Sequence, residues 1–178
     1  MARTQKIDPT LLAAYASQEG QTLASLSAER PQLVAFLRHF GCTFCREMVA
    51  DLAARRKEIE ARGSQLAFVH LGTEEKAKSF FTYYKLTDVP RFSDPQAQLY
   101  QAFGLTRAEL RQYLNRESLS RMFVAWFHGH FVGFPAGDVE RMPGVFLLHN
   151  AEIHKAFRHD LVSDRPDYLA LATLLPIS

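Results

Sequence analysis

The sequence contains little of what several specialised protein classes require. Its 178 residues include only two cysteines and one tryptophan, and its formal net charge is +2. Two cysteines are too few for a disulfide-rich secreted scaffold and favour a reducing compartment, so we expect the cytoplasm. The small net charge does not indicate a nucleic-acid surface, and no apolar run approaches the length of a membrane span. Residues 1–18 lack the continuous apolar segment of a signal peptide.

Length and composition are those of one ordinary globular domain. Hydrophobic residues make up 47% of the chain and charged residues 22%, which at this length is enough to bury a core. We expect a lead-in over residues 1–19, irregular or with a short helix, followed by a single domain over residues 20–178.

One stretch near the end of the first quarter of the chain organises the predicted fold. The apolar run 33–37 is short and has no helical period, which is typical of a buried strand. After it, apolar residues recur every three or four positions, which indicates a helix over residues 43–62, ended by Gly63. Cys42 and Cys45 therefore lie where the strand meets the helix.

Two cysteines in the first turn of a helix can carry redox chemistry. The partial positive charge at the helix N-terminus stabilises a thiolate, and the two-residue spacing provides an attacking and a resolving sulfur. A zinc site would need four ligands, but there is no third cysteine, and His154 and His159 are expected on a strand pair. A permanent disulfide across so short a loop would stabilise the fold only weakly. We therefore favour redox chemistry over a metal site or a structural disulfide.

The rest of the chain alternates strands and helices, which predicts parallel central strands with right-handed crossovers. The other expected elements are a hairpin or edge segment at 22–26, strands at 65–71 and 89–93, helices beginning at Thr73, Asp94 and Thr106, a strand pair at 145–148 and 153–158, and a last helix beginning at Pro166.

An aromatic stretch lies between these elements, over residues 119–134. We expect it to pack an additional helix onto the sheet. The alternatives are a pocket wall for an apolar substrate and the face of a homodimer. His128 and His130 within it are expected to be loop histidines, because two ligands without a third group do not make a metal site.

The segment Phe36–Glu47, which reads FLRHFGCTFCRE, resembles the signature of peroxiredoxin-like redox proteins related to selenoprotein L, in the alkyl hydroperoxide reductase/thiol-specific antioxidant (AhpC/TSA) superfamily. Further similarity lies in 92–95, 99–100, 137–138 and 143–147. The resemblance implies a single-domain thioredoxin-like α/β fold. In such a fold a mixed central sheet is flanked by helices, here with a helical insertion before the late strand pair.

The resemblance also implies a thiol-dependent antioxidant oxidoreductase that reduces peroxides or disulfides without a cofactor or metal. Thioredoxin or a small thiol would be its reductant. Transferred by position, Cys42 is the exposed attacking thiol and Cys45 the buried resolving thiol. Pro143 takes the place of the cis-proline that faces the cysteines in this fold. The competing interpretation is a non-catalytic redox sensor or binding module, which would be oxidised once instead of turning over.

Several neighbours are expected to support the pair. Arg38 or Arg46 would lower the pKa of Cys42, and Thr43 and Phe44 would set the potential and shape of the intervening turn. His39 would act as a proton donor or thiolate partner, or would be a surface histidine at the end of a strand.

The sequence departs from the peroxiredoxin pattern Pro-x-x-x-Thr-x-x-Cys. Ala35 and His39 occupy the proline and threonine positions, and Arg141 is displaced from the place of a peroxide-polarising arginine. Fast reduction of hydrogen peroxide is therefore not expected from this motif alone, although the cysteine pair is intact.

Overall fold

The computed structural model describes residues 4–105, 141–161 and 164–174. Its strands are β1 (Gln5–Lys6), β2 (Gln32–Phe36), β3 (Gln65–His70), β4 (Arg91–Ser93), β5 (Gly144–His149) and β6 (Glu152–Arg158). Its helices are α1 (Pro9–Ala13), α2 (Leu23–Glu29), α3 (Thr43–Ala61), α4 (Glu74–Tyr83), α5 (Gln98–Ala102) and α8 (Tyr168–Leu171).

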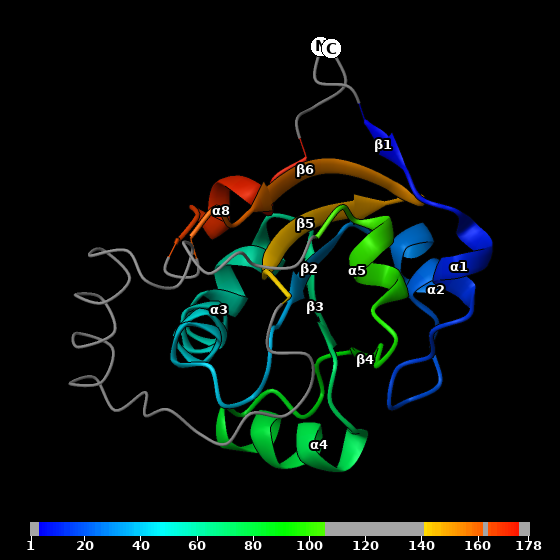
Figure 1. Ribbon diagram of the computed structural model, residues 1–178. Helices are drawn as coiled ribbons and strands as arrows, with labels where there is room; N and C mark the ends of the chain where they lie inside the picture. Colours follow the sequence, from blue (N-terminus) through cyan, green and yellow to red (C-terminus); the bar gives the residue numbers. More distant parts are fainter. Residues whose placement is uncertain (1–3, 106–140, 162–163, 175–178) are drawn as a thin grey trace.

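The strands form one mixed sheet with helices on both faces (Figure 1). The strand order is β1-β6-β5-β2-β3-β4. Strands β2, β3 and β4 are parallel, as the strand–helix alternation predicts, whereas β5, β6 and β1 pair antiparallel. The mixed sheet flanked by helices confirms the predicted fold class. Because β1 belongs to this sheet, part of the expected lead-in contributes to it, and the domain boundary at residue 20 stays a prediction.

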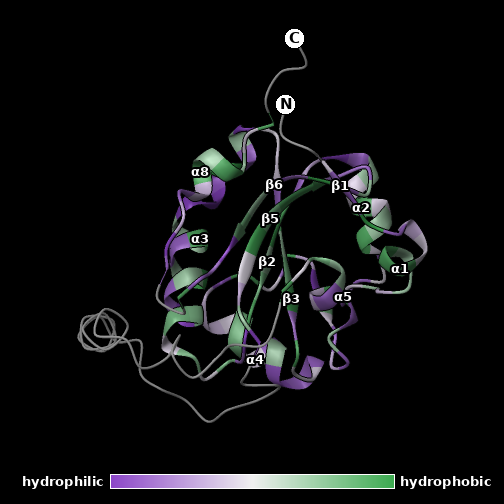
Figure 2. Cartoon of the chain, turned by 45° about the horizontal axis from the view of Figure 1, so that its top comes forward, coloured by the Kyte–Doolittle hydropathy of each residue, from purple (hydrophilic) through white to green (hydrophobic). Residues whose placement is uncertain are grey.

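Two cores lie on opposite faces of the sheet. Strand β2 is buried along its whole length, because its alternate side chains enter different cores. Leu33 and Ala35 face the core under α3, α4 and α8, and Val34 and Phe36 face the core under α1, α2 and α5. Figure 2 shows these apolar strands running through the middle of the molecule.

The expected hairpin or edge segment at 22–26 is wrong. Residues 23–29 form α2 instead, and the hydroxyl of Thr22 caps it by accepting a hydrogen bond from the N–H of Ser25 at 3.1 Å. Leu23 and Leu26 are buried on one helical face. A single bridge between Ala16 and Thr22 is the only pairing that this segment makes in the part of the chain the structure describes.

The helix expected to begin at Asp94 begins later, at Gln98. Asp94 is fully buried, and its carboxylate accepts hydrogen bonds from the N–H groups of Gln98, Leu99 and Tyr100. It therefore satisfies the free amides of α5 from outside the helix, which is the capping function that the sequence indicates.

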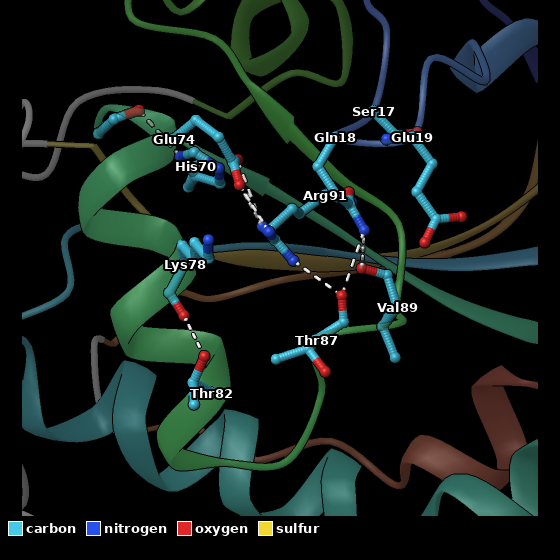
Figure 3. Close-up of polar contacts among 11 residues, drawn as sticks. Ser17, Gln18, Glu19, His70, Glu74, Lys78, Thr82, Thr87, Val89 and Arg91 are labelled. Atoms are coloured by element: carbon cyan, nitrogen blue, oxygen red, sulfur yellow. Dashed lines mark hydrogen bonds and ion pairs between the residues drawn. The ribbon is translucent and has the colours of Figure 1, made fainter.

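The outer edge of β4 is bonded to a side chain (Figure 3). The Oε1 atom of Gln18 accepts from the N–H of Arg91 at 3.0 Å, and its Nε2 atom donates to the carbonyl of Val89 at 3.1 Å. The guanidinium of Arg91 is buried and forms an ion pair with Glu74 at 2.6 Å. The Arg91–Glu74 ion pair therefore holds the start of α4 against β4.

Some expectations fall outside the described residues. These are the helix beginning at Thr106, the aromatic stretch 119–134 with His128 and His130, and the helical insertion they would form. Within the described ranges, no helix is long and apolar enough to cross a membrane.

Candidate functional site: a cysteine pair at the start of α3

The two cysteines lie between the carboxyl end of β2 and the first turn of α3. Cys42 is the N-cap residue, with extended backbone angles (φ −75°, ψ 119°), and Cys45 is in the first helical turn. The N–H of Cys42 donates to the carbonyl of His39 at 3.0 Å, which closes a turn before the helix. The strand-to-helix junction predicted from the sequence is therefore present.

Both cysteines are free thiols and both are buried, with 5% of Cys42 and 1% of Cys45 exposed. The expectation of an exposed Cys42 is wrong. The side chain of Arg38, which is itself buried, lies against the sulfur of Cys42 and contributes to this burial, and the rest of Cys42 belongs to the core under α3. Cys45 is buried as expected.

Arg38 contacts both sulfurs. Its Nη1 atom donates to the Sγ atom of Cys42 at 3.3 Å, and its backbone N–H donates to the Sγ atom of Cys45 at 3.3 Å. Its Nε atom donates to the backbone carbonyl of Arg141 at 3.0 Å, which fixes the guanidinium between the two chain segments. A fixed cation and an amide are thus directed at the pair.

The two thiols differ strongly in acidity. A hydrogen bond from the Cys45 thiol lowers the pKa of Cys42 to about 6, helped by Arg38 and by the N–H groups of Cys45 and Phe44, although burial opposes this. The same hydrogen bond and burial raise the pKa of Cys45 well above its ordinary value. These opposite shifts favour the negative charge of the pair on Cys42 and the proton on Cys45.

His39 is half-buried and is placed next to the pair in sequence, without a hydrogen bond to either sulfur among the described residues. Burial and the neighbouring Arg38 lower its pKa to about 4, so its imidazole is neutral at physiological pH. A neutral imidazole does not supply a proton readily, which weakens the expectation that His39 is a proton donor.

Thr43 and Phe44 occupy the turn between the cysteines, as their sequence positions require. Thr43 is buried, and its hydroxyl has no hydrogen-bond partner in the residues that the structure describes. Phe44 is partly buried and packs against the core under α3. Their expected influence on the redox potential stays a prediction.

Pro143 directly precedes β5, whose first residue, Gly144, pairs with Phe36 of β2. This register places Pro143 at the same end of the sheet as the cysteines. The described part of the chain contains no cis peptide bond, so the expected cis-proline is wrong. The carbonyl of Pro143 instead accepts a hydrogen bond from the Nδ1 atom of His159 at 3.1 Å.

Two features of the site were not predicted from the sequence. The first is the backbone carbonyl of Arg141, which lies 103 positions from Arg38 along the chain and carries no sequence signal. The second is the aromatic and glycine packing around Phe40, for which the only signal was a glycine directly after a strand, Gly72. No group of three or more histidine, cysteine or acidic residues that could hold a metal ion occurs within the described ranges.

Comparison with known proteins identifies relatives by sequence. Prostamide/prostaglandin F synthase of Salmo salar is 31% identical over 164 residues, covering 87% of this chain and 78% of that protein. The thioredoxin-like protein AAED1, chloroplastic, of Arabidopsis thaliana is 32% identical over 80 residues, covering 45% of this chain and 32% of that protein. The peroxiredoxin-like 2C protein of Mus musculus is 31% identical over 96 residues, and the chain spans less than half of that protein's length, as it does for the Arabidopsis one.

Solved peroxiredoxin structures share the fold. A cysteine-to-serine mutant of Xylella fastidiosa PrxQ superposes with a TM-score of 0.66 at 15% identity, covering 96% of this chain and 91% of that one. Reduced Prx3 of Vibrio vulnificus, solved in complex with hydrogen peroxide, gives a TM-score of 0.65 at 12% identity and covers 97% of this chain and 98% of that one. The thioredoxin-like fold expected from the sequence is therefore confirmed, whereas the finer likeness to selenoprotein L stays a prediction.

A family comparison matches residues 51–160, more than half of the chain, to the AhpC/TSA antioxidant enzymes. The matched range begins after Cys45, so it identifies the family without testing the role of the cysteines. With the relatives and the shared fold, it leads to one conclusion: this chain is a peroxiredoxin-like member of the AhpC/TSA antioxidant enzyme family.

Proposed function

We propose that this protein is a thiol-dependent antioxidant oxidoreductase in which Cys42 attacks a peroxide and Cys45 resolves the product. The observation that carries the proposal is the hydrogen bond of 3.3 Å from the Arg38 guanidinium to the Cys42 sulfur. A thiolate, and not a thiol, is the nucleophile, and a fixed cation beside a helix N-terminus keeps Cys42 in that form.

The chemistry has three balanced steps. The Cys42 thiolate attacks one peroxide oxygen, the O–O bond breaks, and the leaving alkoxide or hydroxide takes a proton, so that Cys42 becomes a sulfenic acid. The Cys45 sulfur, after losing its proton, then attacks the Cys42 sulfur and releases water, forming the disulfide. Thioredoxin or a small thiol reduces this disulfide by exchange and restores both thiols.

Burial supports a small peroxide over a protein disulfide as the substrate. With 5% of Cys42 exposed, a sulfur atom on a folded partner cannot approach along the line of its S–S bond unless Arg38 moves. A hydroperoxide group is far smaller. A disulfide substrate, the other alternative expected from the sequence, therefore requires an additional opening step.

The test is steady-state turnover with thioredoxin, its reductase and three oxidants: hydrogen peroxide, an organic hydroperoxide and a protein disulfide. We expect continuous consumption of the peroxides, slower reduction of the protein disulfide, and loss of both in Cys42→Ser. Peroxide consumption by Cys42→Ser at the parent rate would exclude the proposed mechanism.

The second candidate function is a non-catalytic redox sensor. The burial of both sulfurs favours it, because a reductant must also reach the Cys42–Cys45 disulfide for turnover to continue. A sensor would consume about one equivalent of peroxide in the same assay and then stop, with the thioredoxin system still active on an added control substrate.

A further inference from the structure

Phe40 lies in the loop that joins β2 to α3, two residues before Cys42, and 8% of it is exposed. Its backbone carbonyl accepts a hydrogen bond from the Nε atom of Arg46 at 2.9 Å. Because Arg46 directly follows Cys45, this bond ties the loop before the first cysteine to the helical turn that carries the second.

The ring of Phe40 is enclosed by residues from two other elements. Its centroid lies 4.8 Å from that of Phe80 on α4 and 5.3 Å from that of His70 at the end of β3. Gly72 completes the enclosure: a Cβ atom at this position would lie only 2.6 Å from the Cε2 atom of Phe40. The ring can therefore occupy this place only because residue 72 has no side chain.

The enclosure itself is held by hydrogen bonds. The carbonyl of Gly72 accepts from the Nδ1 atom of His70 at 3.0 Å and from the Oγ atom of Ser93 at 2.8 Å. Glu74, the first residue of α4, forms an ion pair with Arg91 of β4, which joins this helix to the sheet (Figure 3). The carboxyl ends of β3 and β4 and the start of α4 thus form one rigid support for the ring.

We propose that Phe40 is a positioning residue, whose enclosed ring fixes the loop that places Cys42 against Arg38. The proposal rests on the proposed function, because it concerns the same cysteine. The loop is short: the N–H of Cys42 is bonded to the carbonyl of His39, on the other side of Phe40. A shift of the ring is therefore transmitted to the Cys42 sulfur, and a hydrogen bond to a charged sulfur weakens as it lengthens or bends.

The experiment measures the ionisation of Cys42 directly, without any substrate. In the reduced full-length protein, thiolate absorbance and the rate of alkylation by iodoacetamide are followed against pH. Two variants displace the ring in different ways. Gly72→Ala inserts a methyl group where the ring lies, at a position whose backbone is outside the left-handed region, and Phe40→Leu removes the ring.

We expect the midpoint of Cys42 ionisation to rise by roughly one pH unit in each variant. The reason is that a weakened hydrogen bond from Arg38 stabilises the Cys42 thiolate less, while the neutral thiol is little affected. Alkylation at the pH of the parent midpoint should slow by about five- to sixfold, because a one-unit rise lowers the thiolate fraction by that factor. In the double variant the effects should not add, because the new methyl group no longer meets the ring.

Phe92→Leu is the matched control. Phe92 is fully buried in the core on the opposite face of the sheet, so the same change in volume should lower thermal stability and leave the Cys42 midpoint unchanged. Unchanged midpoints in both Gly72→Ala and Phe40→Leu, or an equal shift in Phe92→Leu, would overturn the proposal. Either result can be obtained whether or not the protein turns over peroxide, so it is distinguishable from failure of the proposed function.

Discussion

Arg38 donates to the sulfur of Cys42 from its guanidinium and to that of Cys45 from its backbone N–H, both at 3.3 Å. Arg38 thus contacts the two cysteines through two different groups. One is its side-chain guanidinium, which the carbonyl of Arg141 holds in place, and the other is its backbone N–H. The side-chain contact can be removed by substitution, whereas the backbone contact remains.

We expect Arg38→Met to raise the ionisation midpoint of Cys42 by roughly one to two pH units. The reason is that a hydrogen bond to a charged group contributes about 1.5–3 kcal/mol. Peroxide consumption at pH 7 should fall by about two- to tenfold, because the fraction of Cys42 present as thiolate falls by that factor when a pKa of about 6 rises by one to two units. Stopped-flow mixing measures the rate, and thiolate titration measures the midpoint. Arg55→Met, which removes an exposed cation from α3, the helix that carries Cys45, should leave both measurements unchanged. An equal loss there would mean that net charge, and not contact, is responsible.

Cys45→Ser should convert the transient sulfenic acid on Cys42 into a persistent one. The resolving sulfur is then missing, so the sulfenic acid cannot condense to the Cys42–Cys45 disulfide. After one equivalent of peroxide, mass spectrometry with a dimedone probe should find one labelled site, on Cys42. The parent protein should give an unlabelled disulfide instead. Label of equal intensity in both proteins would show that Cys45 does not resolve the intermediate.

Acid should destabilise the fold through buried neutral histidines. Burial lowers the pKa values of His70 and His159 from an ordinary 6.5 to about 4, so the folded state binds fewer protons than the unfolded state between these values. Stability is therefore fully present above about pH 6.5 and is lost as the pH falls towards 4. Urea midpoints should decrease across this range. Each variant is referred to its own value near pH 7.5, and the decrease should be smaller in His70→Gln than in His154→Gln, which changes a partly buried histidine on β6. Equal slopes would contradict this assignment.

Removing the partner of the buried Arg91 should destabilise the protein. The guanidinium of Arg91 donates three hydrogen bonds to the carboxylate of Glu74 and one to the carbonyl of Thr87, and 5% of the Arg91 side chain is exposed. Glu74→Gln leaves this buried cation without its charge partner, and we expect a loss of roughly 1–3 kcal/mol in the free energy of unfolding by urea. Glu75→Gln, at an exposed neighbouring position, serves as the control and should change it by less than about 0.5 kcal/mol.

The elements that position the cysteines were predictable because their signals are local. The change from a continuous apolar run in 33–37 to a helical period after Cys45 is visible in the sequence, and so is the stop at Gly63, which has a positive φ of 83°. Thr22 shows the limit of such signals. A threonine can begin either an extended segment or a helix. Here the helix forms because it buries Leu23 and Leu26 in the core under α1, α2 and α5.

The environment of the sulfurs was not predictable in the same way. The sulfur of Cys42 contacts the side chain of Arg38, and that side chain is held by a backbone carbonyl far along the chain. The residues around Pro143 carry no local signal for a cis or a trans bond. Only the resemblance suggested the cis form, and the bond is trans. Local pattern fixes where the cysteines are, while contacts between distant segments decide how open and how acidic they are.

The contact of Gln18 with β4 bears on how two copies could associate. The N–H of Arg91 and the carbonyl of Val89 would be needed to extend the sheet beyond β4, and both are already bonded to one glutamine side chain. A homodimer in which the sheet continues from one subunit into the next across the β4 edge would have to displace the side chain of Gln18.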